Sequence, residues 1–337
     1  MRHIVVASLM VVLFAGLTIL VLTTTNILPT LASEEGALVD QMFRAQLYVI
    51  AFIFWLIVVF MIYSVVVFRK RPGDESEGQY VKGNTPLEIG WTLVPLIIVM
   101  IFATWGAIHL NEITAGEEGE LIVEVTGFQF GWRFDYPQSG VSSDELWLPL
   151  GRQVLFRITS RDVIHSFWVP EFRIKQDAVP GRWTDLRVKA TETGDYRLRC
   201  AELCGYAHAA MISRVVVVEP AAFEAWLQGM AVAQPTPGDV TPAGRGAILA
   251  QDNGCLSCHS VDGTTLVGPT WQGLYGSERQ LEDGSTVTAD EEYLRSSILD
   301  PASEVVAGFP NVMPAAYNFL PDEDITALVE YIKTLGR

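Results

Sequence analysis

The stretch of this chain that most strongly indicates its fold and chemistry is CAELCGYAHAAM, residues 200–211. It brings two thiols, an imidazole and a thioether into one short segment through Cys200, Cys204, His208 and Met211. Soft sulfur donors combined with imidazole suit copper. Two alternatives use only part of this set: a disulfide between the two cysteines, which an oxidising compartment would permit, or a structural zinc ion. Neither explains Met211, so the pattern favours copper.

The sequence around this loop alternates between apolar and polar residues, as half-buried strands do. Short runs of this kind, separated by Gly and Pro, predict a small β-sandwich or barrel between residues 121 and 218. The predicted strands are Leu121–Thr126, Gln153–Thr159, Trp183–Val188, Tyr196–Cys200 and Ile212–Val218. His165 lies on an apolar stretch upstream of the loop. A lone histidine on an apolar stretch would be interpreted as a core residue. His165 is a candidate ligand because the donors of the loop would leave a second copper ion short of nitrogen.

Three apolar stretches occupy the first 110 residues. Ile4–Leu22 follows Arg2 and precedes a polar stretch, which is typical of a signal peptide cleaved near Ala32. An uncleaved helix is the alternative. The second stretch, Ala45–Phe68, and the third, from about residue 87 to 110, are long enough to span a bilayer.

A basic cluster sets the orientation of these segments. Arg69, Lys70 and Arg71 follow the second stretch directly, so this loop is predicted to be cytoplasmic and the chain beyond about residue 111 to lie outside. Glu88 is an isolated acid near the start of the third stretch. It is either an interfacial carboxylate or a proton-uptake group that faces a partner subunit.

The C-terminal part carries a second redox signature. Cys255-Leu-Ser-Cys258-His259 has the C-x-x-C-H spacing of covalent haem c attachment. Met313 lies downstream, where it would complete His/Met axial ligation of the haem iron; a core methionine is the alternative. No histidine follows His259 in the sequence.

Helical patterns and a proline-rich segment surround this signature. Helices are predicted over Pro220–Met230, Pro242–Asn253 and Asp322–Leu335. Between the first two lies the polar linker Gln234–Pro242, whose reach is under roughly 30 Å. The second soluble part is therefore expected to stay close to the first.

The charge balance restricts the partners. The chain has 39 acidic and 23 basic residues, a formal net charge of −16. Because phosphate binding needs Lys and Arg, this acidic balance argues against nucleic acid as a partner. A basic protein partner is favoured instead. Acidic residues that could attract it are Glu282, Asp283, Asp290, Glu291 and Glu292; the alternative, which the pattern favours, is a solvated acidic face.

The copper loop resembles the binuclear copper A motif of cytochrome c oxidase subunit II. The resemblance covers roughly residues 40–220 and extends to Asn84-Thr-Pro-Leu-Glu-Ile-Gly-Trp-Thr-Leu-Val-Pro95, which is similar to the start of that family's second membrane helix. The C-terminal part resembles a class I cytochrome c, and the fusion resembles the caa-type oxidases. The resemblance implies a transmembrane α-helical hairpin, an all-β cupredoxin sandwich and an all-α cytochrome c domain.

The resemblance also assigns roles to individual residues. Cys200 and Cys204 would bridge two copper ions, and His165 and His208 would each bind one. Met211 and the carbonyl of Glu202 would complete the ligand set, and the Glu202 carboxylate would face a magnesium site at the boundary with subunit I. Glu88 would lie at a proton-channel mouth. In the cytochrome, Gly246 and Tyr331 would lie at a helix crossing and Pro269 would support His259.

One position departs from the family pattern. The segment Gly127-Phe-Gln-Phe-Gly-Trp132 matches an aromatic segment of the family, but Phe130 stands where the usual tryptophan receives electrons from soluble cytochrome c. This substitution suggests a different donor for the copper.

The expected function is that of the electron-transfer subunit of a terminal respiratory oxidase. It would pass electrons from haem c to copper A and on to subunit I, where oxygen reduction and proton pumping occur. The external donor would be a cytochrome c or an upstream respiratory complex. The same subunit in a copper A nitric oxide reductase is the nearest alternative. A non-redox or quinol-oxidase subunit lacks the copper ligands, and nitrous oxide reductase would not explain two spanning helices.

The expected organisation follows from these patterns. A signal peptide or N-terminal helix covers residues 1–32, a transmembrane hairpin 40–112 and the cupredoxin domain 118–219. A helix and linker cover 220–241, and the cytochrome c domain covers 242–337. The chain is expected in a bacterial inner membrane, with its soluble domains on the extracytoplasmic side.

Overall fold

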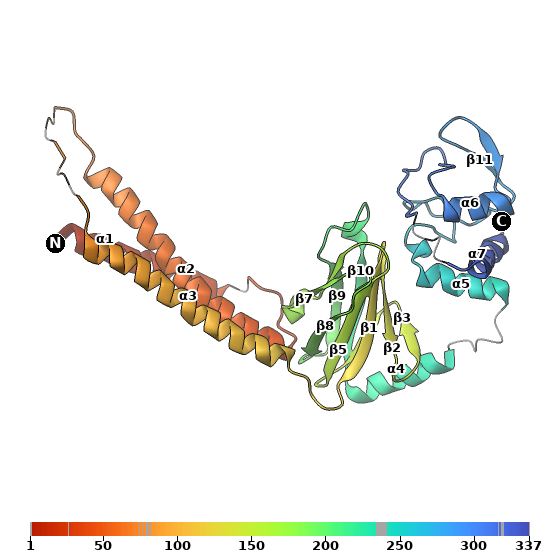
Figure 1. Cartoon of the computed structure of the whole chain (residues 1–337), viewed down its shortest axis with the longest axis horizontal. Helices are drawn as coiled ribbons and strands as arrows, with labels where there is room; N and C mark the ends of the chain where they lie inside the picture. The colour runs from red at the N-terminus through yellow and green to blue at the C-terminus, as the bar shows by residue number, and fades with distance from the viewer. Residues whose placement is uncertain are drawn as a thin grey trace. The chain divides into compact units, whose positions relative to one another are not determined.

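The computed structural model describes residues 2–25, 27–73, 75, 77–78, 80, 82–233, 241–315, 317 and 320–336 (Figure 1). Two compact units are present, Met1–Ala115 and Gly116–Arg337. Most of the predicted linker Gln234–Pro242 lies outside the described residues. Each unit is considered by itself below.

The first unit contains α1 (Arg2–Thr24), α2 (Glu34–Val67) and α3 (Thr85–Thr114), and each of these described helices is long and apolar enough to cross a membrane. Helix α2 begins well before the predicted Ala45. The Ser33 side chain caps it by accepting a hydrogen bond from the Gly36 N–H at 2.9 Å. Hydropathy indicates only the apolar part of such a helix, so the sequence pattern does not predict the polar first turns of α2.

Helix α1 packs along α2. Ala7, Val11 and Val59 are buried together, and the Trp55 indole N–H donates to the Thr18 hydroxyl at 2.8 Å. A polar N–H within a hydrocarbon layer needs such a protein partner, because no water is available to it. The two helices are therefore matched both in shape and in hydrogen bonding.

A β-sandwich follows in the second unit. One sheet has the order β3-β2-β1-β5-β8 and the other β4-β10-β9-β6-β7. The strands are β1 (Leu121–Phe128), β2 (Gly131–Tyr136), β3 (Val141–Ser143), β4 (Leu146–Pro149), β5 (Gln153–Ser160), β6 (His165–Trp168), β7 (Lys175–Ala178), β8 (Thr184–Lys189), β9 (Gly194–Cys200) and β10 (Ile212–Val218). The two faces that meet form the core, which includes Val123, Phe134, Phe156, Phe167 and Val215. All five predicted strands are present, and the predicted sandwich is confirmed.

Helix α4 (Pro220–Ala233) is fastened to the sandwich by aromatic side chains. Phe223 is fully buried, and Trp226 stacks on Trp147 with ring centroids 5.2 Å apart and an interplanar angle of 10°. Tyr136 meets Trp226 edge-on at 5.2 Å. The predicted helix Pro220–Met230 is thus present and is part of the sandwich domain.

The C-terminal part is mainly helical, as predicted. It contains α5 (Pro242–Asp252), α6 (Glu291–Leu299) and α7 (Asp322–Thr334), together with the small hairpin of β11 (Glu278–Gln280) and β12 (Thr286–Thr288). A Cβ at Gly246 would collide with the backbone of Ala327 and with the Cβ of Tyr331. Only glycine permits so close an approach of α5 to α7, and the predicted placement of Gly246 and Tyr331 at a helix crossing is confirmed.

Candidate metal and haem centres

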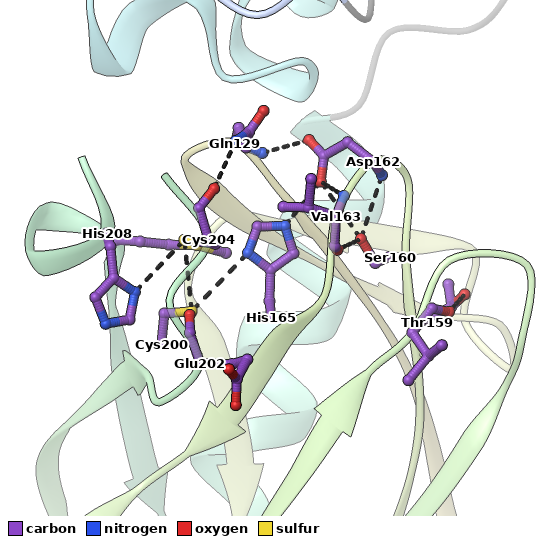
Figure 2. Close-up of polar contacts among 12 residues, drawn as sticks. Gln129, Thr159, Ser160, Asp162, Val163, His165, Cys200, Glu202, Cys204 and His208 are labelled. Atoms are coloured by element: carbon purple, nitrogen blue, oxygen red, sulfur yellow. Dashed lines mark hydrogen bonds and ion pairs between the residues drawn. The ribbon is translucent and has the colours of Figure 1, made fainter. Parts of the chain in front are cut away.

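The copper loop connects β9 to β10 and gathers its sulfur atoms at one end of the sandwich (Figure 2). The Sγ atoms of Cys200 and Cys204 are 3.8 Å apart, and both thiols are free. Met211 Sδ lies 3.8 Å from Cys204 Sγ, and His208 Nδ1 lies 3.5 Å from the same sulfur. The loop therefore brings together all four donor side chains that the sequence singled out.

His165 joins this cluster from strand β6. Its Nδ1 atom lies 3.9 Å from Cys200 Sγ, and the ligand atoms of His165, Cys200 and Cys204 all lie within 4.8 Å of one another. His165 is completely buried. The prediction that a residue far upstream completes the loop is consistent with this placement.

Asp162 fixes the orientation of the His165 ring. Its Oδ1 atom lies 2.8 Å from His165 Nε2, while its carboxylate accepts from the backbone N–H groups of Gln129 at 2.7 Å and Val163 at 2.6 Å. A carboxylate on one ring nitrogen selects the tautomer in which the other nitrogen can ligate a metal. The Nδ1 atom is thereby turned toward the sulfurs.

The two thiols differ in acidity. Burial raises the pKa of Cys200, but hydrogen bonds from His165 and the backbone outweigh it and lower that pKa to about 6. Burial, followed by the charge on Cys200, raises the pKa of Cys204. The first thiolate therefore opposes formation of the second. A bound cation would stabilise both thiolates, which are the form of cysteine that ligates a metal.

Glu202 presents two different groups to its surroundings. Its backbone carbonyl lies 3.2 Å from Cys200 Sγ, whereas the residue is exposed and its carboxylate points away from the sulfurs (Figure 2).

Glu88 lies in the first turn of α3, exposed, where its Oε1 accepts from the Asn84 N–H at 3.0 Å. In this position Glu88 helps to cap the helix.

A separate cavity lies in the C-terminal part. It is lined mostly by apolar side chains and, among the predicted residues, by Cys255, Cys258, His259 and Met313. Apolar walls with a histidine and a methionine suit a haem, whose macrocycle is itself largely apolar. The four residues that the sequence proposed for haem binding thus line one cavity.

His259 is held for ligation through one ring nitrogen. Its Nδ1 atom hydrogen-bonds to the Pro269 carbonyl at 2.8 Å, so the predicted support by Pro269 is confirmed. The Trp271 ring stacks on the imidazole with centroids 5.2 Å apart. Burial lowers the pKa of His259, which favours the neutral ring that binds metal.

Sequence reasoning gave no role to several residues at these sites. Asp162 lies three positions before His165, and this spacing is a local signal that the carboxylate can reach the imidazole. Gln129 donates from its side chain to the Cys204 carbonyl at 2.5 Å, which only the fold reveals. Phe130, which the sequence did single out, is buried, and a Cβ at Gly205 would approach its ring to 3.1 Å.

Fold and site together define a class: membrane-anchored electron-transfer proteins with a cysteine-rich metal loop on a β-sandwich and a C-x-x-C-H haem cavity. Three family models match the chain: cytochrome c oxidase subunit II, transmembrane domain, over residues 24–106; its periplasmic domain, over residues 138–219; and cytochrome c, over residues 243–336. The chain belongs to the cytochrome c oxidase subunit II family and carries a cytochrome c domain at its C-terminus.

Curated relatives agree with this family. Cytochrome c oxidase subunit 2 of Alkalihalophilus pseudofirmus is 37% identical over 289 residues, covering 83% of this chain and 82% of the relative. The protein of the same name from Bacillus subtilis is 30% identical over 297 residues, covering 82% of each chain. The crystal structure of the periplasmic domain of subunit II of cytochrome oxidase from Bradyrhizobium japonicum is 30% identical, covers 35% of this chain and 97% of its own, and has a TM-score of 0.34.

The family settles the general role. The chain is an electron-transfer subunit of an oxidase complex, and the nitric oxide reductase alternative is not favoured. The family implies copper A in the sandwich and haem c in the C-terminal domain. Its membrane helices and extracytoplasmic soluble part also agree with the predicted membrane protein.

Proposed function

We propose that the residues gathered at the two sites hold these redox groups. The copper ligands are His165, Cys200, Cys204, His208, Met211 and the carbonyl of Glu202, and the haem ligands and attachment points are Cys255, Cys258, His259 and Met313. The observation that carries the proposal is convergence: the copper donors come from β6 and the β9–β10 loop and still meet around two free thiols. When bound, the two groups supply the one-electron redox changes that the side chains cannot.

The protein contributes rigidity. Electron transfer is fast when the ligands need not move between redox states, so buried donors held from several directions are favourable. His165 is held by Asp162, Met211 is fully buried, and His259 is held between Pro269 and Trp271. Because every ligand position in this proposal is assigned to a group of the protein, neither site would have an open position for a substrate.

The remaining assignments place the chain in its complex. Electrons arrive at the haem domain from a basic external donor, a cytochrome c or an upstream respiratory complex, and leave the copper toward subunit I. The exposed Glu202 carboxylate is available to a magnesium ion at that boundary. The soluble domains lie outside a bacterial inner membrane; the cupredoxin domain covers residues 118–219 with α4 packed onto it, and the cytochrome c domain covers residues 242–337. The N-terminal segment 1–32 is either cleaved or retained as α1.

The proposal is tested by the visible–near-infrared spectrum and metal content of the purified protein. We expect a c-type haem spectrum together with the absorption of a mixed-valence copper pair, and a binuclear complement of copper. A single copper per chain, or zinc in its place, would contradict the ligand assignment even if the haem is present.

Met313→Ala is expected to lower the haem reduction potential. A thioether axial ligand favours reduced iron, so its loss stabilises the oxidised state, by about 100 mV or more within the wide range that axial ligands span. Potentiometric titration measures the shift. Survival of the weak long-wavelength absorption band of methionine ligation in the variant would assign the iron to another residue.

Glu88→Gln is expected to slow turnover of the assembled oxidase severalfold while reduction of copper by the haem stays unchanged. The reason is an isolated carboxylate at the predicted cytoplasmic end of a membrane helix, where such groups serve proton transfer. Glutamine still accepts the hydrogen bond from Asn84, so the cap survives. Equal turnover of variant and wild type across pH would leave Glu88 with the capping role alone.

A further inference from the structure

The end of α5 contacts the sandwich within the second unit. Asp252 forms an ion pair with Arg133 of β2. Arg161, which follows β5, donates through Nη1 to the Asp252 carbonyl at 3.2 Å and to the Asn253 side-chain oxygen at 2.8 Å. Two arginines of the copper domain thus contact two consecutive residues that lie just before the haem-binding Cys255.

The charges in this contact are complementary in two ways. The last carbonyls of a helix carry partial negative charge, and α5 ends at Asp252, so its dipole adds to the carboxylate that faces the arginines. The side chains of Arg133 and Asp252 are 21% and 30% exposed, and Asn253 is buried. Salt screens such a contact less than it screens an open surface pair.

Apolar packing brings the two domains closer at the next residue. Gly254 has a positive φ of 69°, and a Cβ there would collide with the Phe128 ring. The Arg161 guanidinium lies over the same ring, 5.4 Å from its centroid. Glycine therefore lets the turn that leads into Cys255 rest directly on the aromatic segment of the copper domain.

Gln129 reaches both redox sites. It belongs to the sandwich, yet it is among the described residues that line the haem cavity. Its side-chain N–H donates to the carbonyl of Cys204 at 2.5 Å, and its backbone N–H donates to Asp162, which orients His165 (Figure 2). One residue thus separates the haem cavity from a predicted copper ligand.

We propose that Arg133, Arg161 and Phe128 form an internal docking surface for the haem domain of the same chain, with Gln129 as the positioning residue between the two centres. The surface combines Phe128 of the aromatic segment with the two flanking arginines, and its occupant is the end of α5. The proposal rests on the proposed function for its redox meaning, whereas the contact itself does not depend on bound metal.

The test combines hydrogen–deuterium exchange with a kinetic measurement on the purified full-chain oxidase. Asp252→Asn removes the ion pair without a change in size, and Arg133→Gln removes it with a shorter, uncharged side chain. Each is expected to increase amide exchange in segments 127–133 and 248–254 and to slow haem-to-copper electron transfer, both about tenfold, which is the low end of the range for close charge pairs between proteins. The matched controls are Glu278→Gln on β11 and Arg152→Gln on the sandwich, two exposed residues outside this contact.

The double variant Asp252→Asn/Arg133→Gln distinguishes a direct contact from two separate defects. Partners that touch give non-additive effects, so we expect the double variant to exchange and transfer electrons like either single variant. Unchanged protection in both segments, effects that add, or equal effects in the controls would overturn the docking surface. A failure of the proposed function would appear differently, as a missing copper or haem spectrum in a wild-type chain whose exchange pattern is still protected.

Discussion

Replacing Cys200 or Cys204 by serine is expected to abolish the binuclear copper centre and to leave the haem intact. Both sulfurs are proposed to hold the copper ions, so neither substitution would leave a smaller version of the same centre. Serine is a hard and weakly acidic donor that does not replace a thiolate for copper. Because second-shell changes alone cost 10–100-fold in metal affinity, loss of a bridging ligand should exceed about a hundredfold.

Metal analysis and the near-infrared spectrum measure this effect. Leu203→Ser is the matched control, because Leu203 belongs to the same loop, is 78% exposed and offers no ligand. The control should keep its copper. A Cys200→Ser chain with full copper and the native spectrum would refute the assignment of both sulfurs as bridges. An unchanged haem spectrum in all variants would show that the C-terminal domain folds normally.

A chain that ends at Met230 is expected to keep its copper but to accept electrons from soluble cytochrome c far more slowly than the full chain. The tether raises the effective concentration of donor near the copper into the millimolar range, and its loss should cost roughly a hundredfold or more in rate. Phe130 adds to this effect, because a buried phenylalanine is neither polar nor easily oxidised.

The truncated chain retains what its fold needs. Phe223 and Trp226, which fasten α4 to the sandwich, both precede residue 230. Reduction of its copper by a small-molecule reductant serves as the control for an intact centre. Turnover equal to that of the full chain at several salt concentrations would mean that the copper domain has a donor site of its own and that the haem domain is accessory.

The predictable parts of this structure are those with a local signal. The loop 200–211 carries its donors in one segment, and C-x-x-C-H has fixed spacing, so both were found from the sequence. Long alternating strands such as β1 and β5 were found for the same reason. Strand β7 reads Lys-Gln-Asp-Ala and was missed, because it has no apolar alternation. Helix α6 was missed because its short segment, EEYLRSSIL, gives few turns over which a period can be recognised.

Other features depend on tertiary placement and give no local signal. Gln129 acquires its position only when β1 and the β9–β10 loop come together. The sequence does not distinguish Arg133 and Arg161 from other arginines. Their common partner, Asp252, lies about ninety positions or more away. In β2 the buried residues Trp132, Phe134 and Tyr136 alternate with half-buried ones, so this strand does carry a local period-two signal.

The aromatic fastening of α4 has a consequence for how the oxidase responds to dilution. Because Trp226 is stacked on Trp147, α4 is fixed to the sandwich. The connection to the haem domain therefore starts at the end of α4 and not at the end of β10. A haem domain that dissociates from the docking surface then stays within a small volume around it before it binds again. Its return is a unimolecular event, so the internal step should proceed at the same rate in a crowded membrane and in a dilute detergent solution. Only the arrival of electrons from outside should depend on how much donor is present.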